Sequence, residues 1–266
     1  MTLMYNALLY PFLFIYGTAI GSFLNVLIDR LPNEQSIMGR SHCDYCKKTL
    51  QGIDLFPIFS FLLLKGKCRY CHKKLSYFYP FVEILTGIAF ILTWMYFPVV
   101  GRTVVLQTLG KIAGLGIISS LIVIIFADLK YQIIPDSMQV SFLISTIVLH
   151  VANGVTSSDF LNYFFAGLSI MSPILFLFLI TKGRGMGFGD VKLAFIFGFL
   201  LGAAGGFTVL YISFLTGGII GGFLLAFRKK GMRSTIAFGP YLVLGIIIVL
   251  FFNAQIHALL SRYYGL

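Results

Sequence analysis

Apolar residues gather in long, nearly uninterrupted stretches along this chain, and this pattern predicts membrane-spanning helices. A helix needs roughly 20 mostly apolar residues to cross the hydrocarbon core of a bilayer, and most of the stretches approach that length. The sixth stretch is the shortest, and only the segment from Gly202 to Gly206 separates it from the seventh, so seven spans remain an alternative to eight. The predicted stretches are 7–28, 78–97, 104–126, 137–152, 160–181, 189–203, 205–227 and 236–260.

The composition agrees with this pattern. Of the 266 residues, 58% are hydrophobic and only 11% are charged, whereas soluble domains are usually about 25% charged. The mean hydropathy is +0.93. These values exclude a disordered chain, a collagen and a secreted disulfide scaffold. They predict an all-α polytopic membrane protein with about eight transmembrane helices.

The distribution of basic residues predicts the orientation. With eight spans and an outside N-terminus, the inside loops 29–77, 127–136, 182–190 and 228–235 hold 9, 1, 2 and 4 Lys or Arg residues. With Lys192, 17 of the 20 basic residues then lie on the cytoplasmic side, as the positive-inside rule requires. The net charge of +11 therefore indicates orientation, and we expect no nucleic-acid partner. The first stretch lacks a basic n-region and a small-residue cleavage site, so it is expected to be a retained anchor.

The loop 29–77 carries all four cysteines, as Cys43-x2-Cys46 and Cys68-x2-Cys71. Two closely spaced pairs are typical of a structural zinc site, in which four thiolates surround one ion and leave no open coordination position. Two disulfides are the alternative, but such bonds rarely persist in the reducing cytoplasm. His42 and His72 flank the cysteines and could replace a ligand, although exposed neighbours are the simpler interpretation.

Carboxylates beside the apolar stretches are the candidate chemistry, because only nine acidic residues occur in the chain. Asp128 lies at the inner end of the third stretch, and Asp190 opens the sixth, in Gly187-Phe188-Gly189-Asp190. Two spans lie between them, so both carboxyl groups return to the cytoplasmic face and can meet. Two carboxyl groups sharing a site do not ionise together easily, which provides one acid and one base for activating water.

The positions of these aspartates at helix ends assign them provisional roles. Asp128 lies at a helix C-terminus, where the helix dipole favours a protonated acid, and Asp190 lies at an N-terminus, where it favours an ionised base. Asp136 follows Pro135 and precedes Gln139 by three residues. This spacing predicts an N-cap with a capping box, and hence a structural role for Asp136.

Together these segments resemble the type IV prepilin peptidases, which are membrane aspartic proteases that often also act as N-methyltransferases. Gly21-Ser22-Phe23-Leu24-Asn25-Val26 with Arg30-Leu31-Pro32 resembles the opening signature of the family, and the four-cysteine loop resembles that of its bifunctional members. Tyr79 to Glu83, Asp128-Leu129-Lys130 with Ile134-Pro135-Asp136, and Gly187 to Asp190 match later motifs in order.

The resemblance implies cleavage, after a glycine, of the basic leader of a prepilin or pseudopilin at the cytoplasmic face of a bacterial inner membrane. Asp128 and Asp190 are then the catalytic residues. The four cysteines favour subsequent methylation of the new N-terminal amine from S-adenosylmethionine, with Glu83 as a candidate at the methyl-donor site. The expected division is a first helix (1–28), a cytoplasmic zinc-binding loop (29–77) and a membrane-embedded protease domain (78–266).

Three other functions fit parts of the pattern. An ion- or proton-coupled transporter would also use intramembrane carboxylates and glycine-broken helices, although its site is expected near the bilayer midplane and no inverted repeat is evident. A zinc-bearing scaffold of a secretion machine would need no catalysis. A peptidase without methyltransferase activity would keep both aspartates.

Overall fold

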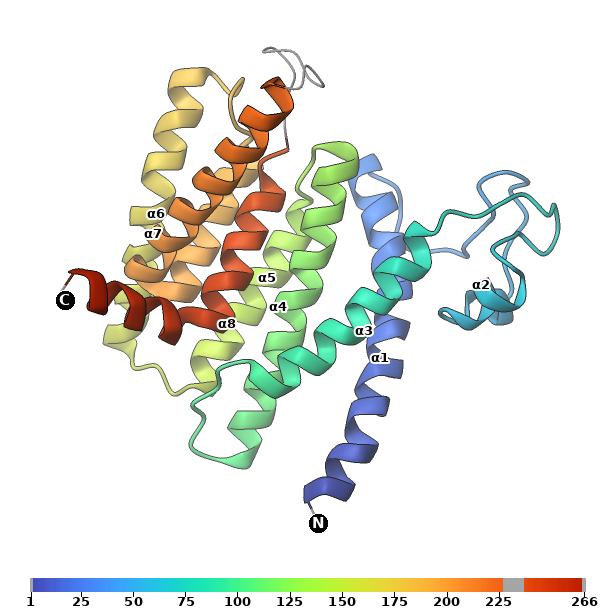
Figure 1. The fold of residues 1–266 in the computed structure, drawn as a ribbon, viewed down its shortest axis with the longest axis horizontal. Helices are drawn as coiled ribbons and strands as arrows, with labels where there is room; N and C mark the ends of the chain where they lie inside the picture. Colours follow the sequence, from blue (N-terminus) through green and yellow to red (C-terminus); the bar gives the residue numbers. More distant parts are fainter. Residues whose placement is uncertain (1, 227–236, 265–266) are drawn as a thin grey trace. The chain divides into compact units, whose positions relative to one another are not determined.

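A computed structural model describes residues 2–226 and 237–264, and the segment 228–235, predicted as a basic inside loop, lies outside the described residues. The described chain folds into helices (Figure 1). The short helices are η1 (Leu31–Asn33), η2 (Gly52–Leu55) and α2 (Phe59–Leu63). The longer ones are α1 (Thr2–Arg30), α3 (Phe78–Tyr96), α4 (Val104–Tyr131), α5 (Asp136–Ala152), α6 (Ser157–Thr181), α7 (Phe188–Ala226) and α8 (Gly239–Tyr264).

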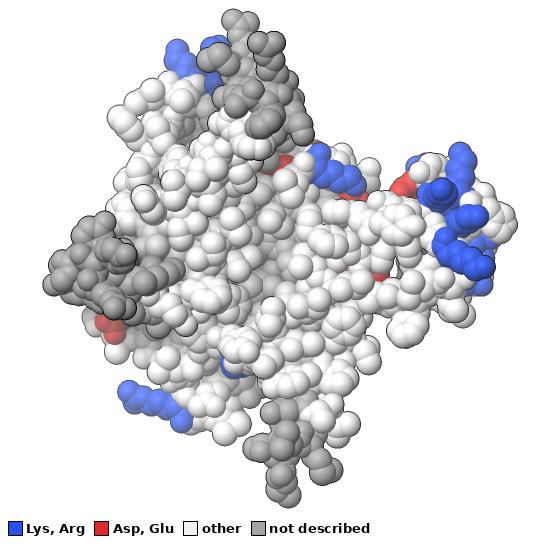
Figure 2. Space-filling view, in the orientation of Figure 1, with Lys and Arg blue, Asp and Glu red and all other residues white. Residues whose placement is uncertain are grey.

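The long helices confirm the all-α class in the described part of the chain, and they are consistent with a multi-pass membrane protein. Among the described residues, five helices are long and apolar enough to cross a bilayer: α1, α3, α4, α6 and α7. The apolar helices Asp136–Ala152 and Gly239–Phe252 are shorter. On the face shown in Figure 2, the helices carry few charged side chains, whereas Lys and Arg side chains gather on the loop between α1 and α3.

The chain divides into two compact units, Met1–Met95 and Tyr96–Leu266. In the first unit, α1 packs against α3 through glycines. A Cβ atom placed on Gly17 would lie 2.8 Å from the Cα of Gly87, and one on Gly21 would lie 2.8 Å from the Cα of Glu83. Small residues at these positions let the two backbones approach closely, as is common between helices in membranes.

In the second unit, α4 packs against α5 and α8, and α7 packs against α6, α5 and α8 (Figure 1). The helix α7 is interrupted at Gly202, whose φ of 73° and ψ of 178° are not helical. A Cβ atom on Gly206 would lie 3.3 Å from the Cα of Gly198. Eight residues of continuous helix would instead span about 12 Å. The chain therefore reverses at Gly202, where the sequence predicts the boundary between two apolar stretches.

Candidate active site and metal centre

Asp128 lies in the last turn of α4, and its side chain is 5% exposed. Its Oδ2 accepts a hydrogen bond of 2.8 Å from the backbone N–H of Gly239, the first residue of α8. A free N–H at the start of a helix is a natural donor to a carboxylate. The contact joins two segments that are 111 residues apart in the sequence.

Asp190 lies in the first turn of α7 and is 6% exposed. Its Oδ2 accepts a hydrogen bond of 3.0 Å from the N–H of Gly187, in the glycine-rich loop just before the helix. The other oxygen, Oδ1, is buried and has no hydrogen-bond partner among the described residues. This oxygen is therefore left available as an acceptor.

Asp128 and Asp190 lie at the ends of two helices, α4 and α7, that both pack against α5. Both belong to the second unit, where α7 packs on α5 and α5 packs on α4. The loop before α5 also meets the start of α7, because a Cβ atom on Gly189 would lie 3.0 Å from the Cβ of Ile134. The structure therefore assembles the segments that carry the two carboxyl groups within one compact unit.

The expectation that Asp136 caps α5 is wrong. The N-cap residue is Pro135, which makes no side-chain cap, and Asp136 is the first residue of the helix. Gln139 closes no capping box, because both polar atoms of its buried side chain are without a partner in the described part of the chain. Asp136 instead accepts two hydrogen bonds, of 2.7 and 2.8 Å, from the ammonium group of Lys192 in α7. Its side chain is 70% exposed, unlike those of Asp128 and Asp190.

Gly239 is a site residue that the sequence reasoning missed. A Cβ atom there would lie 2.6 Å from Oδ2 of Asp128, so only glycine admits this contact without a shift. The signal was present as Gly239-Pro240 at the start of the last apolar stretch, because proline favours the first turn of a helix. The sequence does not indicate which side chain that turn approaches.

The two cysteine pairs sit on two copies of the same turn. The N–H of Cys43 donates to the carbonyl of Lys48, and the N–H of Cys68 donates to the carbonyl of Lys73. In each copy the residue after the second cysteine has a positive φ, 57° for Lys47 and 55° for His72. Repeated turns of this kind orient two thiols each toward one point.

The four thiols of Cys43, Cys46, Cys68 and Cys71 form one group in which all sulfur atoms lie within 4.8 Å of one another. The Sγ atoms of Cys43 and Cys71 are 3.9 Å apart. A tetrahedral zinc ion with Zn–S bonds of about 2.3 Å places its sulfurs about 3.8 Å apart, whereas a disulfide requires about 2.05 Å. The residues therefore fit a metal ion. Neither His42 nor His72 belongs to the group found among the described residues.

The cluster also has unusual acidity. Burial raises the pKa of the Cys43 thiol, but the N–H groups of Cys46 and Tyr45 and the neighbouring thiols outweigh it and lower the pKa to about 7. The N–H of Lys73 lowers the pKa of Cys71, but burial and the other three thiols raise it to about 11. Repulsion between neighbouring thiolates prevents all four cysteines from losing their protons when no metal is bound. A divalent cation offsets that repulsion and allows all four to ionise.

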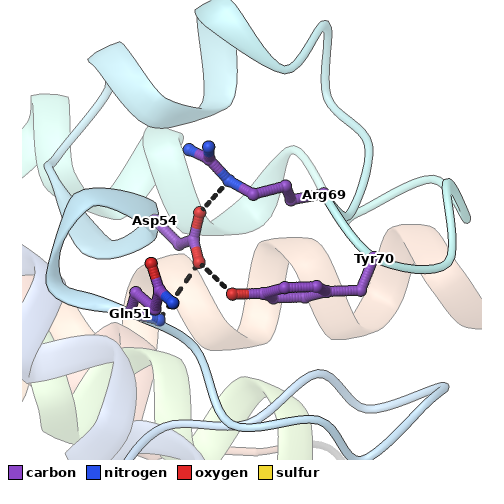
Figure 3. A network of polar contacts seen from close by, with 4 residues as sticks. All are labelled: Gln51, Asp54, Arg69 and Tyr70. Carbon is purple, nitrogen blue, oxygen red and sulfur yellow. Dashed lines mark hydrogen bonds and ion pairs between the residues drawn. The ribbon is translucent and has the colours of Figure 1, made fainter.

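A polar network stabilises the segment between the two turns (Figure 3). The Asp54 carboxylate accepts hydrogen bonds from the N–H of Gln51, the hydroxyl of Tyr70 and the guanidinium group of Arg69. Burial raises the pKa of Asp54, but these donors outweigh it and hold the pKa below its usual range. The network ties η2 to the second cysteine turn.

Glu83 lies in the first unit, in α3, and is 7% exposed. Its Oε2 accepts a hydrogen bond of 2.8 Å from the N–H of Ile58, which precedes α2. The carboxylate of Glu83 is therefore held by a backbone N–H of the loop. Glu83 also lines a cavity of about 500 Å³ between α1, α3 and the loop.

Two family models match the chain. The bacterial peptidase A24 N-terminal domain matches residues 15–97, and the type IV leader peptidase family matches residues 115–222. The first match contains the cysteine cluster and Glu83, and the second contains Asp128 and Asp190. No solved structure matches the chain significantly.

Curated proteins described as prepilin leader peptidase/N-methyltransferase match over most of the chain. The protein from Bacillus subtilis (strain 168) is 30% identical over 250 residues, covering 92% of this chain and 94% of its own. That from Legionella pneumophila is 32% identical over 268 residues, covering 91% of each chain. That from Aeromonas salmonicida (strain A449) is 30% identical over 269 residues, covering 89% and 88%.

The cysteine geometry predicts about one zinc ion per chain, measured by elemental analysis of protein purified without a metal-binding tag. Replacing Cys43 and Cys46 together with serine should remove the ion, because two ligands are too few to retain it. The matched controls are His42→Asn and His72→Asn, which should keep the ion. A folded wild-type protein without metal would contradict this prediction.

Proposed function

This chain belongs to the type IV leader peptidase family, and from that premise we propose that it cleaves the basic leader of prepilin or pseudopilin precursors after a glycine. Membership of a peptidase family argues against the transporter and the non-catalytic scaffold. The observation that carries the proposal is that Asp128 and Asp190 are both buried in the second unit, and each accepts a hydrogen bond from a backbone N–H beside the start of a helix.

The proposed cleavage mechanism is that of an aspartic protease. Asp190 is the base that takes a proton from water, and its unpartnered Oδ1 is the acceptor. Asp128 is the acid that protonates the leaving amine. The helix dipoles support this assignment, because Asp190 lies at the N-terminus of α7 and Asp128 near the C-terminus of α4. The two carboxyl groups share one proton in this mechanism, so the apparent pKa values describe the pair and not either residue alone.

We further propose that the protein methylates the new N-terminal amine. When bound, S-adenosylmethionine supplies the methyl group. The nitrogen of the new N-terminus forms a bond to the methyl carbon, and the bond between that carbon and sulfur breaks. The electron pair of the broken bond stays on sulfur, and the nitrogen releases a proton to water. Glu83, buried beside a cavity, is the proposed residue at the donor site. The four cysteines hold a structural zinc ion.

The proposed topology has eight spans: α1, α3, α4, α5, α6, the two parts of α7 on either side of Gly202, and α8. It places the segment 29–77 and both aspartates at the cytoplasmic face of a bacterial inner membrane, in contact with lipid. This arrangement follows the basic residues, which the positive-inside rule assigns to the cytoplasm. The functional division stays 1–28, 29–77 and 78–266.

The dyad is tested with Asp128→Asn and Asp190→Asn. Each should lower leader cleavage by at least about 100-fold, because amides keep the shape of the side chain but cannot exchange the proton. The measurement is cleavage of a prepilin peptide by purified protein in detergent, with zinc content as the check on folding.

Asp136→Asn is the matched control. It breaks an exposed ion pair, which usually contributes only about 0.2–1 kcal/mol, so cleavage should stay within about fivefold of the wild-type rate. An inactive Asp136→Asn beside an active Asp128→Asn, at equal expression, would reassign the pair to Asp136 and Asp190.

The contact between Gly239 and Asp128 predicts a specific effect of one added methyl group. Gly239→Ala should lower kcat/KM for cleavage by about 10- to 100-fold, because its Cβ must displace the carboxylate by a fraction of an ångström or more. Gly218→Ala, where no heavy atom lies within 4 Å of the new Cβ, should change cleavage less than about twofold. Equal rates for both variants would show that the position of Asp128 tolerates this shift.

Cleavage and methylation should be separable. Asp128 and Asp190 belong to one compact unit, whereas the cysteine cluster and Glu83 belong to the other. The Cys43→Ser, Cys46→Ser double variant should therefore lose more methyl transfer than cleavage, both followed by mass spectrometry of one peptide substrate. Equal loss of both would mean that the loop supports the whole fold, and no methyl transfer by the wild type would identify a peptidase alone.

A further inference from the structure

The short helix α2 and the turn before it expose an apolar surface on a loop that is otherwise basic. Phe59, Leu62 and Leu63 are 61%, 65% and 81% exposed, and Phe56, whose ring lies 5.6 Å from that of Phe59, is exposed as well. These four residues form the α2 patch. Phe176 of α6, a helix able to span a bilayer, is 63% exposed. The α2 patch is therefore as exposed as a surface that faces lipid, and apolar groups of this kind mark contact with a protein or a membrane.

The opposite side of the same segment is also apolar, but it is covered. The ring of Phe61 meets that of Tyr77 edge-on, with centroids 5.3 Å apart. Phe61 and Leu64 line the cavity of the first unit. A helix with apolar side chains on every face is typically surrounded by apolar material on every side. The α2 patch is the one side of this segment that the described part of the chain leaves uncovered.

Contacts within the first unit place α2 beside the helices α1 and α3. The N–H of Ile58, the residue before α2, donates to Oε2 of Glu83, which is the sixth residue of α3. Glu83 lies against Gly21 of α1. Gly21 precedes the end of α1 at Arg30 by nine residues, a rise of about 13.5 Å along the helix. The segment α2 therefore begins at the level of the two apolar helices and not beyond the ends where they enter the loop.

The turn that holds α2 at this level is strained. Ile58 has a φ of 62° and a ψ of −51°, a conformation that a β-branched residue adopts only where its surroundings enforce it. The hydrogen bond to Glu83 supplies part of that constraint. Strain of this kind is kept where the placement of a segment matters to function. Here the segment that the turn places is the one that carries the α2 patch.

Basic side chains follow the α2 patch directly. Lys65 and Lys67 come just after α2, and both are exposed. The segment 29–77 carries nine Lys or Arg residues against four Asp or Glu residues, and Figure 2 shows the basic side chains gathered on this loop. An apolar surface bordered by cations fits an anionic bilayer surface, because apolar groups enter the acyl boundary while ammonium groups meet the lipid phosphates.

We propose that the α2 patch docks into the bilayer interface where α1 ends and α3 begins, and that Lys65 and Lys67 contact anionic lipid phosphates there. Lipid is the occupant because both ends of the loop are held by helices able to span the bilayer. The exposed apolar side chains of Phe81 and Ile84, beside Glu83 in α3, continue this surface. The contact goes beyond leader cleavage and methylation and does not depend on either.

The test uses tryptophan as a depth probe, because the chain contains a single tryptophan, Trp94. In a Trp94→Phe background, Phe59→Trp places the only indole in the α2 patch. The full-length, zinc-loaded protein is reconstituted in nanodiscs of phosphatidylcholine and phosphatidylglycerol, with or without lipids brominated near the top of the acyl chain. Brominated lipid should lower the emission at least about twofold, because an interfacial side chain reaches the acyl boundary. Aqueous iodide should quench this emission weakly.

The matched control is Tyr45→Trp in the same background, which also replaces an exposed aromatic side chain of the loop. The neighbouring Asp44 lies 3.3 Å from the hydroxyl of Tyr79, the second residue of α3, so Tyr45 lies near the end of that helix instead of deeper along it. Its indole should emit at longer wavelength, and iodide should quench it more strongly than brominated lipid does. Zinc content equal to that of the wild type checks the folding of both variants.

Two results would overturn the proposal. Strong iodide quenching of Phe59→Trp, with weak quenching by brominated lipid, would show that the α2 patch faces water. Protection from both quenchers would show that protein covers the patch, either another segment of this chain or a second copy.

The lysines are tested separately. Omitting phosphatidylglycerol should reduce the brominated-lipid quenching of Phe59→Trp, and adding Lys65→Gln with Lys67→Gln should remove this dependence on anionic lipid. Lys47→Gln, the same change at an exposed position in the first cysteine turn, should retain the dependence. An unchanged dependence in the Lys65→Gln, Lys67→Gln variant would overturn the assigned phosphate contacts.

Discussion

The burial of two carboxyl groups at the ends of apolar helices is the constraint on which the second unit depends. A carboxylate removed from water needs hydrogen-bond donors, and Asp128 and Asp190 are both buried. The backbone supplies those donors instead, from Gly239 and Gly187. Both donors are glycines beside a helix start, where N–H groups have no partner within the helix. The approach of α8 to α4 and the geometry of the loop before α7 thus have the same effect: each provides a hydrogen-bond donor to a buried carboxyl group.

Glycine also determines how closely the helices approach one another. Lipid tails are as apolar as the helix surfaces, so hydrophobic burial alone does not drive helix association within a bilayer. Close packing of backbones takes the place of hydrophobic burial. It occurs at Gly17 and Gly87 in the first unit and at Gly198 and Gly206 in the second. The break at Gly202 depends on the same residue type, because its φ of 73° strains any residue with a Cβ.

In the first unit, the loop between α1 and α3 must be held in a fixed structure. A loop of fewer than 50 residues between α1 and α3 buries too little apolar surface to hold a fixed structure by itself. Four thiols, the Asp54 network and the contact from Glu83 to Ile58 supply cross-links instead. Some of these residues, among them Asp54, Arg69 and Glu83, also line the cavity of the first unit, so the contacts that order the loop help to shape that cavity.

The sequence by itself determined the helices, the cysteine cluster and the identity of the buried aspartates, because each depends on local pattern. Hydropathy marks helices, and paired cysteine spacing marks a four-thiol site. The end of α4 was predicted at 126 instead of Tyr131, since the apolar pattern stops near Asp128 while the helical hydrogen bonds continue to Gln132. The sequence predicts that Asp136 caps its own helix, but its carboxylate instead pairs with the ammonium group of Lys192, which is 56 residues away. Only the tertiary structure decided that pairing, the donor from Gly239 and the cavity beside Glu83, because each joins segments whose proximity no local pattern encodes.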